Sequence, residues 1–129
     1  MSHFSTVKTE LRDRDSLLAA LTDLGHTPHQ GALSVRGYRG QCQTAELAVA
    51  QANGADIGFR LNASTGCYEL VTDLELWQQP VPVERFLALL SQRYALRSVL
   101  AASAEEGFAV ASQTQTQDGT IELVVTRWV

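Results

Sequence analysis

An alternation of apolar and polar residues on both sides of an Asn-Gly pair is the feature that most limits how this chain can fold. The apolar positions are every second residue around Asn53-Gly54: Leu47, Val49, Ile57, Phe59 and Leu61. Such a pair between two alternating runs is a strong signal for a β-hairpin. A three-residue loop at 53–55 would pair Val49 with Phe59 and keep the apolar side chains on one face. We therefore predict an antiparallel hairpin with that register.

Two further stretches have the spacing of amphipathic helices. The first begins at Asp13-Arg14-Asp15-Ser16, a typical helix start, and Gly25 can close it. Its apolar positions are Leu17, Leu18, Leu21 and Leu24. The second begins near Pro82, which suits a first helical position. Its apolar positions are Val83, Phe86, Leu87 and Leu90.

The second helical stretch is followed by an apolar set that does not continue it: Leu96, Val99 and Leu100. At about 100° per residue, this set lies roughly opposite Leu90. One straight helix cannot bury both sets against one sheet. We therefore predict a break or sharp bend between Ser91 and Ala95, and then helix to about residue 106.

The remaining elements are short strands and turns. Strands are expected at 4–11, 32–36, 67–72, 108–110 and 121–125, with turns at 62–66 and 118–119. Leu74, Leu76 and Trp77 are expected to close one edge of the core. The whole order predicts a single α+β domain over residues 1–129. It has a mostly antiparallel sheet with helices on one face, ferredoxin-like in general layout.

Composition limits the kinds of partner. The chain has 129 residues, 45% hydrophobic and 19% charged, which is typical of one folded domain. Its formal charge of -4 argues against broad attraction to nucleic acid or to an anionic membrane. The whole net negative charge comes from residues 61–129, so any basic surface must come from the first half of the chain. No apolar run approaches a membrane span and the first residues lack a signal peptide, so we expect a cytoplasmic protein without membrane insertion.

No recognisable catalytic or metal motif is present, and we expect no catalytic residue, metal or cofactor. His26-Thr27-Pro28-His29 and His3 are interpreted as polar loop and terminal residues rather than as metal ligands. Cys42 and Cys67 are expected to be reduced. An enzyme would need His26 or His29 within hydrogen-bonding distance of one of these thiols.

One glycine-rich segment is singled out as a candidate contact site: Arg36-Gly37-Tyr38-Arg39-Gly40-Gln41. Its two guanidinium groups and its backbone N–H groups could bind an anion. Tyrosine and arginine are also frequent anchors of protein interfaces. Three readings stay open: a turn with arginines in water, a contact with a partner protein, and a site for a small anion or an RNA phosphate. Near the other end, Trp128 either packs on the second face of its strand or is an exposed anchor.

These residues carry a family resemblance. The stretches involved are 1–9, Leu24-Gly25, 35–38, 56–59, 68–71, Leu76-Trp77-Gln78-Gln79, 92–95 and 121–128. Over essentially its whole length, the chain resembles the hypothetical chloroplast reading frame thirty-five family, a domain of unknown function found in cyanobacteria and some algal plastids. The resemblance implies a photosynthetic lineage and a place in the cyanobacterial cytosol or plastid stroma. It brings no activity, cofactor or site residue.

Taken together, the patterns favour a non-enzymatic accessory or assembly protein. Its contact with an unidentified protein partner is expected at Arg36-Gly37-Tyr38-Arg39-Gly40-Gln41 and a neighbouring sheet edge. The alternative is a module that binds a small anionic ligand or RNA through Arg36, Tyr38 and Arg39. That alternative predicts that removing both arginines abolishes binding in a salt-dependent manner.

Overall fold

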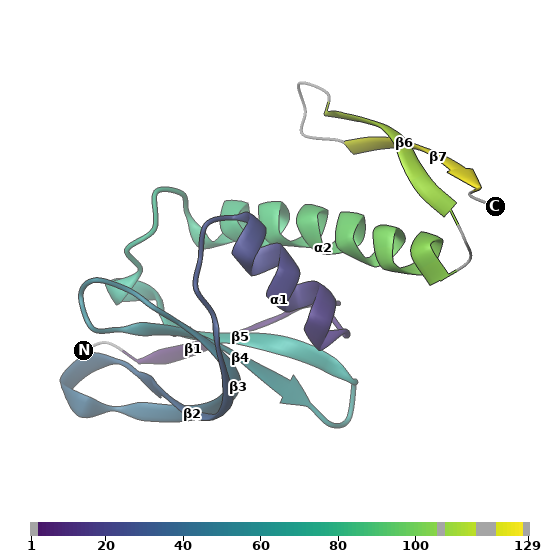
Figure 1. The fold of residues 1–129 in the computed structure, drawn as a ribbon. Coiled ribbons are helices and arrows are strands. Elements are labelled where there is room, and N and C mark those ends of the chain that lie inside the picture. The colour runs from purple at the N-terminus through teal and green to yellow at the C-terminus, as the bar shows by residue number, and fades with distance from the viewer. Residues whose placement is uncertain (1–2, 106–107, 116–120, 128–129) are drawn as a thin grey trace.

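The chain folds as an α+β domain in which two helices cover one face of a five-stranded sheet (Figure 1). The computed structural model describes residues 3–105, 108–115 and 121–127, with backbone alone at Arg39, 108–115 and 122–127. The strands are β1 (Phe4–Lys8), β2 (His29–Arg36), β3 (Cys42–Ala50), β4 (Asp56–Asn62), β5 (Cys67–Asp73), β6 (Phe108–Gln115) and β7 (Ile121–Arg127). The helices are α1 (Arg14–Asp23) and α2 (Val83–Glu105), with short 3-10 turns η1 (Tyr38–Gly40) and η2 (Leu74–Leu76).

The main sheet is antiparallel throughout, with the strand order β1-β5-β4-β3-β2. Strands β2 to β5 follow one another as a meander, and β1 pairs with the far side of β5. The sheet edges are therefore β1 and β2. The predicted strands at 4–11 and 32–36 differ from the structure at their ends: the first is shorter, and β2 begins three residues earlier, with an irregularity between Gln30 and Leu33.

The predicted hairpin forms between β3 and β4, but the predicted register is wrong. Val49 pairs with Ile57, not with Phe59. The turn closes one residue earlier than predicted: Gln51 N–H donates to the carbonyl of Ala55 at 3.1 Å, which leaves residues 52–54 at the tip. The Asn53 side chain in this tip binds the carbonyl of Leu76 at 2.8 Å. The slip is two residues. Side chains alternate with a period of two, so the predicted core face is kept.

Helix α1 follows its sequence signals. The Asp13 carboxylate accepts a hydrogen bond from the N–H of Ser16 at 2.8 Å, which caps the first turn. Gly25 closes the other end with a φ of +89°, a left-handed conformation that favours glycine. Between these ends, Leu17, Ala20 and Leu21 are fully buried.

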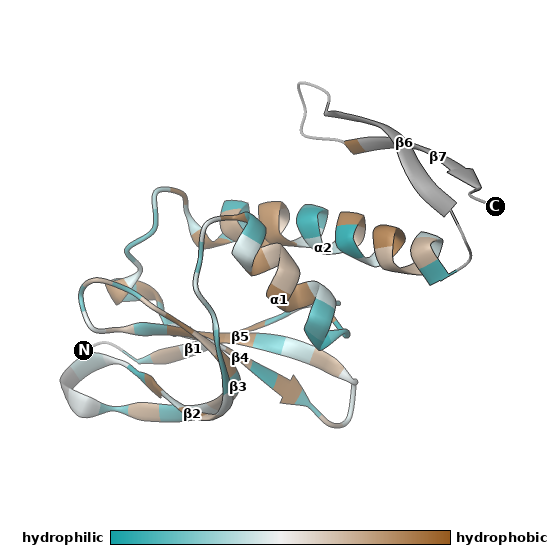
Figure 2. Cartoon of the chain, viewed as in Figure 1, coloured by the Kyte–Doolittle hydropathy of each residue, from teal (hydrophilic) through white to brown (hydrophobic). Residues whose placement is uncertain are grey.

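The predicted break in the second helix is wrong, since α2 runs unbroken from Val83 to Glu105. The stripe that holds Leu90 continues in polar residues. The hydroxyl of Tyr94 accepts the N–H groups of Arg12 and Asp13 at 3.0 and 2.8 Å. Arg97 binds the carboxylate of Asp23, with a Nε–Oδ2 distance of 2.7 Å. Hydrophobic and hydrophilic residues alternate along α2 in Figure 2.

The opposite set on α2 does not need a second sheet. Leu96 is buried, whereas Val99 stays 46% exposed. The polar groups of Tyr94 and Arg97 thus extend the contact of α2 with α1 and the residues just before it. The apolar set of Leu96, Val99 and Leu100 is only partly covered. That combination removes the reason for a bend.

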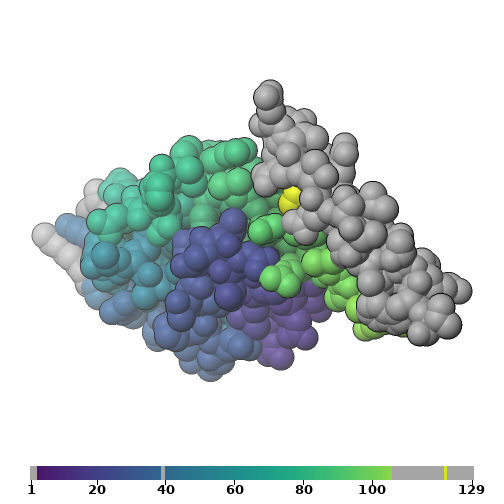
Figure 3. All heavy atoms as spheres, turned by 45° about the horizontal axis from the view of Figure 1, so that its top comes forward, coloured from purple at the N-terminus to yellow at the C-terminus, as the bar shows by residue number. Residues whose placement is uncertain are grey.

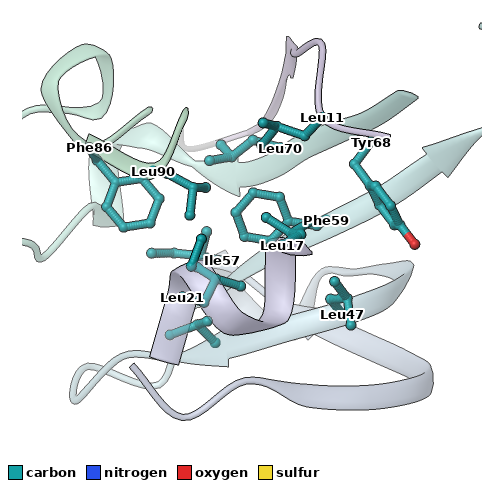
Figure 4. Packing of buried hydrophobic residues seen from close by; sticks show 12 residues of the cluster. Leu11, Leu17, Leu21, Leu47, Ile57, Phe59, Tyr68, Leu70, Phe86 and Leu90 are labelled. Carbon is teal, nitrogen blue, oxygen red and sulfur yellow. The ribbon is translucent and has the colours of Figure 1, made fainter. Parts of the chain in front are cut away.

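The core lies between the sheet and the two helices. Phe59 lies among Leu17, Ile57 and Leu70, and Leu90 points toward it from α2 (Figure 4). Trp77 packs edge-to-face on Phe86 with 5.1 Å between ring centroids. This contact confirms that Trp77 helps close the core edge, although Leu74 is 40% exposed.

Strands β6 and β7 form a separate two-stranded sheet beyond α2 (Figure 1). The strand predicted at 108–110 extends to Gln115. The predicted turn at Asp118-Gly119, the end of the helix near residue 106 and the packing of Trp128 lie outside the described residues. In the described part of the chain, neither helix has the length and apolar character to cross a membrane.

Candidate functional site

The segment 36–41, hereafter the 36–41 loop, connects β2 to β3 in one tight turn. The N–H of Gly37 donates to the carbonyl of Gln41 at 2.8 Å, and the N–H of Gln41 donates to the carbonyl of Tyr38 at 3.1 Å. Gly40 has a φ of +77°, which a residue with a Cβ rarely adopts. The loop therefore has a defined shape of its own.

Arg36 is held by Asp56 of β4. Its Nε and one terminal nitrogen contact the two carboxylate oxygens at 2.9 Å each, and its backbone N–H adds a third bond at 2.8 Å. The Asp56 side chain is 7% exposed, whereas that of Arg36 is 56% exposed. The arginine thus satisfies a buried carboxylate with one edge of its guanidinium and shows the rest to solvent.

The Arg36–Asp56 pair shifts the pKa of both groups. Burial alone would raise the pKa of Asp56, but the hydrogen bonds from Arg36 outweigh it and lower that pKa below its usual value. The hydrogen bond with Asp56 in turn raises the pKa of Arg36. Both groups are charged at neutral pH, and they largely neutralise one another.

Two glycines allow close packing on the second face of the sheet, the one away from the two helices. A Cβ on Gly37 would lie 2.7 Å from the ring of Phe4, and a Cβ on Gly58 would lie 2.4 Å from a methyl group of Val35. Phe4 belongs to one edge strand and Val35 to the other. The second face therefore curls until its two edges share a small apolar cluster: Val35, Ala45 and Ala48, with Phe4 and Leu33 beside them.

The structure thus places the six predicted site residues at the meeting point of both sheet edges. Arg36 and Gly37 have structural partners, and Gly40 and Gln41 are exposed beside the exposed, unbridged Cys42. Tyr38 is half-buried, and the side chain of Arg39 lies outside the description. The arrangement offers a surface of defined shape for contact, in which the charge of Arg36 is matched by Asp56.

The histidines and the cysteines lie in different surroundings. His26 is half-buried and meets Phe86 edge-on at 5.5 Å, and burial lowers its pKa. His29 and Cys42 are exposed, while Cys67 is buried and unbridged. Among the residues that the structure describes, no hydrogen bond joins a histidine to a cysteine. In the same residues, no three His, Cys, Asp or Glu side chains gather as a metal site would require.

Sequence reasoning missed the partners of the loop, Asp56 and Phe4. Nothing in the sequence pattern distinguishes Asp56 from the other acidic residues, and Phe4 fits an ordinary residue of the strand expected at 4–11. One signal was available in Gly58. A glycine inside an alternating strand often marks a close approach by another part of the chain.

Comparison with known proteins places the chain in a family. Residues 20–124 match the family described as a protein of unknown function, DUF1257. An uncharacterized protein ycf35 of Guillardia theta is 42% identical over 128 residues, which cover 99% of this chain and 98% of the relative. Proteins of the same name from Pyropia yezoensis and Cyanophora paradoxa are 37% and 36% identical over the same shares.

No solved structure matches the chain significantly. The matches in sequence nevertheless span almost all of it, and they confirm the resemblance that its motifs carry. The chain belongs to the DUF1257 family and is related over almost its whole length to proteins named ycf35.

Proposed function

We propose that this protein is a non-enzymatic accessory or assembly protein of the cyanobacterial cytosol or plastid stroma. It binds another protein through the 36–41 loop and the adjoining edge of β2. The observation that carries the proposal is that an open strand edge ends in a loop whose shape is already fixed.

The open edge is β2. This strand pairs with β3 on one side only, because it is the last strand of the sheet. Most of its residues before Val35 are exposed: His29, Gln30, Gly31, Ala32 and Ser34. An edge strand presents unpaired backbone groups that an extended segment of a partner can use.

The fixed shape of the loop favours binding. Arg36 is held by Asp56, and Gly37 lies against Phe4. A surface that is ordered before binding loses less conformational entropy when a partner arrives. Gln41 and the exposed edge of Arg36 are the polar groups that such a partner would meet.

The alternative, a site for a small anion or RNA, is weakened by the same ion pair. Arg36 already pairs with the carboxylate of Asp56, which neutralises most of its charge and so weakens its attraction for a second anion. The overall charge of -4 also opposes RNA. Neither the pairing of Arg36 nor the net negative charge opposes the binding of a protein partner.

The test is affinity purification of the tagged full-length protein from a native host, with mass spectrometry of proteins and small molecules. Ala32→Glu adds charge to the exposed strand edge. Ala95→Glu makes the same change on an exposed position of α2. We expect one protein to be recovered in near-equal amount with the wild type and with Ala95→Glu, and to be lost with Ala32→Glu.

Two results contradict the proposal. One is the absence of any partner that distinguishes the two variants. The other is recovery of RNA or a small anion that disappears when Arg36 and Arg39 are both changed to alanine, because that result favours the alternative.

A further inference from the structure

A groove runs between α1 and the second half of α2, away from the 36–41 loop. The two helices lie side by side on this face of the molecule (Figure 3). The groove has a volume of about 500 Å³, within the usual range of ligand-binding pockets. Its lining residues come from both helices and the cap of α1: Asp13, Asp15, Ser16, Ala19, Arg97, Leu100, Ala101 and Glu105.

The walls of the groove are held in place. Tyr94 of α2 accepts the N–H groups of Arg12 and Asp13 at the start of α1. Arg97 binds Asp23 at the end of α1. The two helices are therefore tied together near both ends of α1, so the groove exists before anything binds.

The charge of the groove is one-sided. Asp15 and Glu105 are exposed, and neither side chain makes an ion pair or hydrogen bond with the described residues. The Asp13 carboxylate caps α1 by accepting the N–H of Ser16. The one cation in the lining, Arg97, shares the carboxylate of Asp23 with Arg93. The lining itself holds the carboxylates of Asp13, Asp15 and Glu105 against this one guanidinium, so it carries net negative charge.

The apolar part of the lining, here called the floor, consists of Ala19, Leu100 and Ala101. Leu100 is half-buried and Ala101 is exposed. The two short alanine side chains leave room for an incoming apolar group. A bare polycation would satisfy the carboxylates but would leave this floor in contact with its own charged or polar groups.

We infer that this groove binds a basic segment of a partner protein. Arginine or lysine side chains of that segment face Asp15 and Glu105, and an apolar side chain between them rests on Leu100. Complementary charge supplies orientation and speed of association, and the apolar contact supplies affinity. This contact is independent of the 36–41 loop, and so goes beyond the function proposed above.

The test uses the full chain and a short fluorescein-labelled peptide of alternating arginine and leucine. Fluorescence anisotropy measures its Kd for the wild type and two double variants. Asp15→Asn with Glu105→Gln removes the free carboxylates of the groove. Glu10→Gln with Glu84→Gln removes two exposed carboxylates elsewhere, so both variants have the same net charge.

We expect the groove variant to bind about five- to tenfold more weakly than the wild type, and the control to change less than about twofold. Added salt should weaken wild-type binding. In NMR titrations, the amide signals of Ala19, Leu100 and Ala101 should shift. Circular dichroism verifies that both variants are folded.

Four outcomes overturn the inference. They are no measurable binding, equal weakening in the two variants, equal binding of a peptide in which glutamate replaces arginine, and full displacement of the peptide by an equal concentration of spermidine. The second outcome indicates net charge alone, and the fourth indicates a small polycation. Neither result touches the strand-edge proposal, which the Ala32→Glu variant tests separately.

Discussion

At the scale of single residues, two glycines and one ion pair decide how the second face of the sheet closes. Gly37 and Gly58 leave space for Phe4 and Val35, and Asp56 holds the end of β2 through Arg36. None of these residues contributes a large apolar surface. The glycines matter because they let Phe4 and Val35 approach the backbone. Arg36 and Asp56 matter because each balances the charge of the other.

Gly58→Ala tests the close approach of Val35. The new methyl group would begin 2.4 Å from a Val35 methyl carbon, so one strand must shift. We expect the free energy of unfolding, measured by urea denaturation, to fall by about 1–3 kcal/mol. In a Val35→Ala background the same change should cost clearly less. Equal costs in both backgrounds would contradict this packing.

Asp56→Asn tests the ion pair. The amide cannot accept both guanidinium bonds of Arg36, and its NH₂ group would face other donors. We expect a loss of about 1–3 kcal/mol in the free energy of unfolding, because the site is buried. Glu10→Gln, an exposed carboxylate, serves as the control and should change stability little. A loss no larger than that of the control would show that the pair contributes nothing.

At the scale of elements, the sequence predicts best where one local rule decides. Helix α1 begins after Asp13 and ends before Gly25, as expected, because an N-cap and a left-handed glycine each act on a single turn of the helix. The predicted β3–β4 register is wrong because the turn closes between Gln51 and Ala55, and the Asn53 side chain in it binds Leu76, a partner far along the chain that the local pattern does not show. The break in α2 fails for a related reason: Tyr94 and Arg97 find polar partners that no apolar periodicity can reveal.

The candidate site shows the same division. The composition of the 36–41 loop predicts a turn, and the structure confirms one. Its partner Asp56 lies twenty residues away in sequence and on another strand. Periodicity places Asp56 on a strand, but it cannot say which cation will meet it.

Ala95→Pro tests the continuity of α2. A proline inside an unbroken helix removes a hydrogen bond and clashes with the preceding turn, so we expect a loss of about 3 kcal/mol or more. Ala95→Gly, which keeps the N–H group, should cost about 1 kcal/mol. Thermal and urea unfolding followed by circular dichroism measure both. If the helix were broken near Ala95, the proline would be tolerated as well as the glycine.

At the scale of the whole molecule, the two proposed contacts belong to different layers. The 36–41 loop lies at an end of the sheet, and the acidic groove lies in the helical layer. Variants on one surface therefore leave the other intact. The two layers also hold three groups whose pKa values are lowered in the folded state: His26 beside α2, Asp23 on α1 and Asp56 on β4.

These three groups predict two separate pH windows of stability. Burial lowers the pKa of His26 from 6.5, so below that pH the unfolded chain gains a proton that the folded chain does not bind. The free energy of unfolding should therefore decrease as the pH falls from about 6.5 towards the folded pKa. Asp23 is held low first by its hydrogen bond with Arg97, and Asp56 by its bonds with Arg36, each from an ordinary value of 3.8. Their stabilisation is present above that value and is lost as the pH falls through the folded pKa values.

Urea denaturation across pH 7 to 2.5, in steps, separates the two windows. His26→Gln should flatten the upper window and leave the lower one unchanged, because the glutamine does not titrate. Asp56→Asn should reduce the lower window and leave the upper one unchanged. Each variant is thus the control for the other. An upper slope that survives His26→Gln would mean that another group, and not the imidazole packed on Phe86, links folding of this domain to protons near neutral pH.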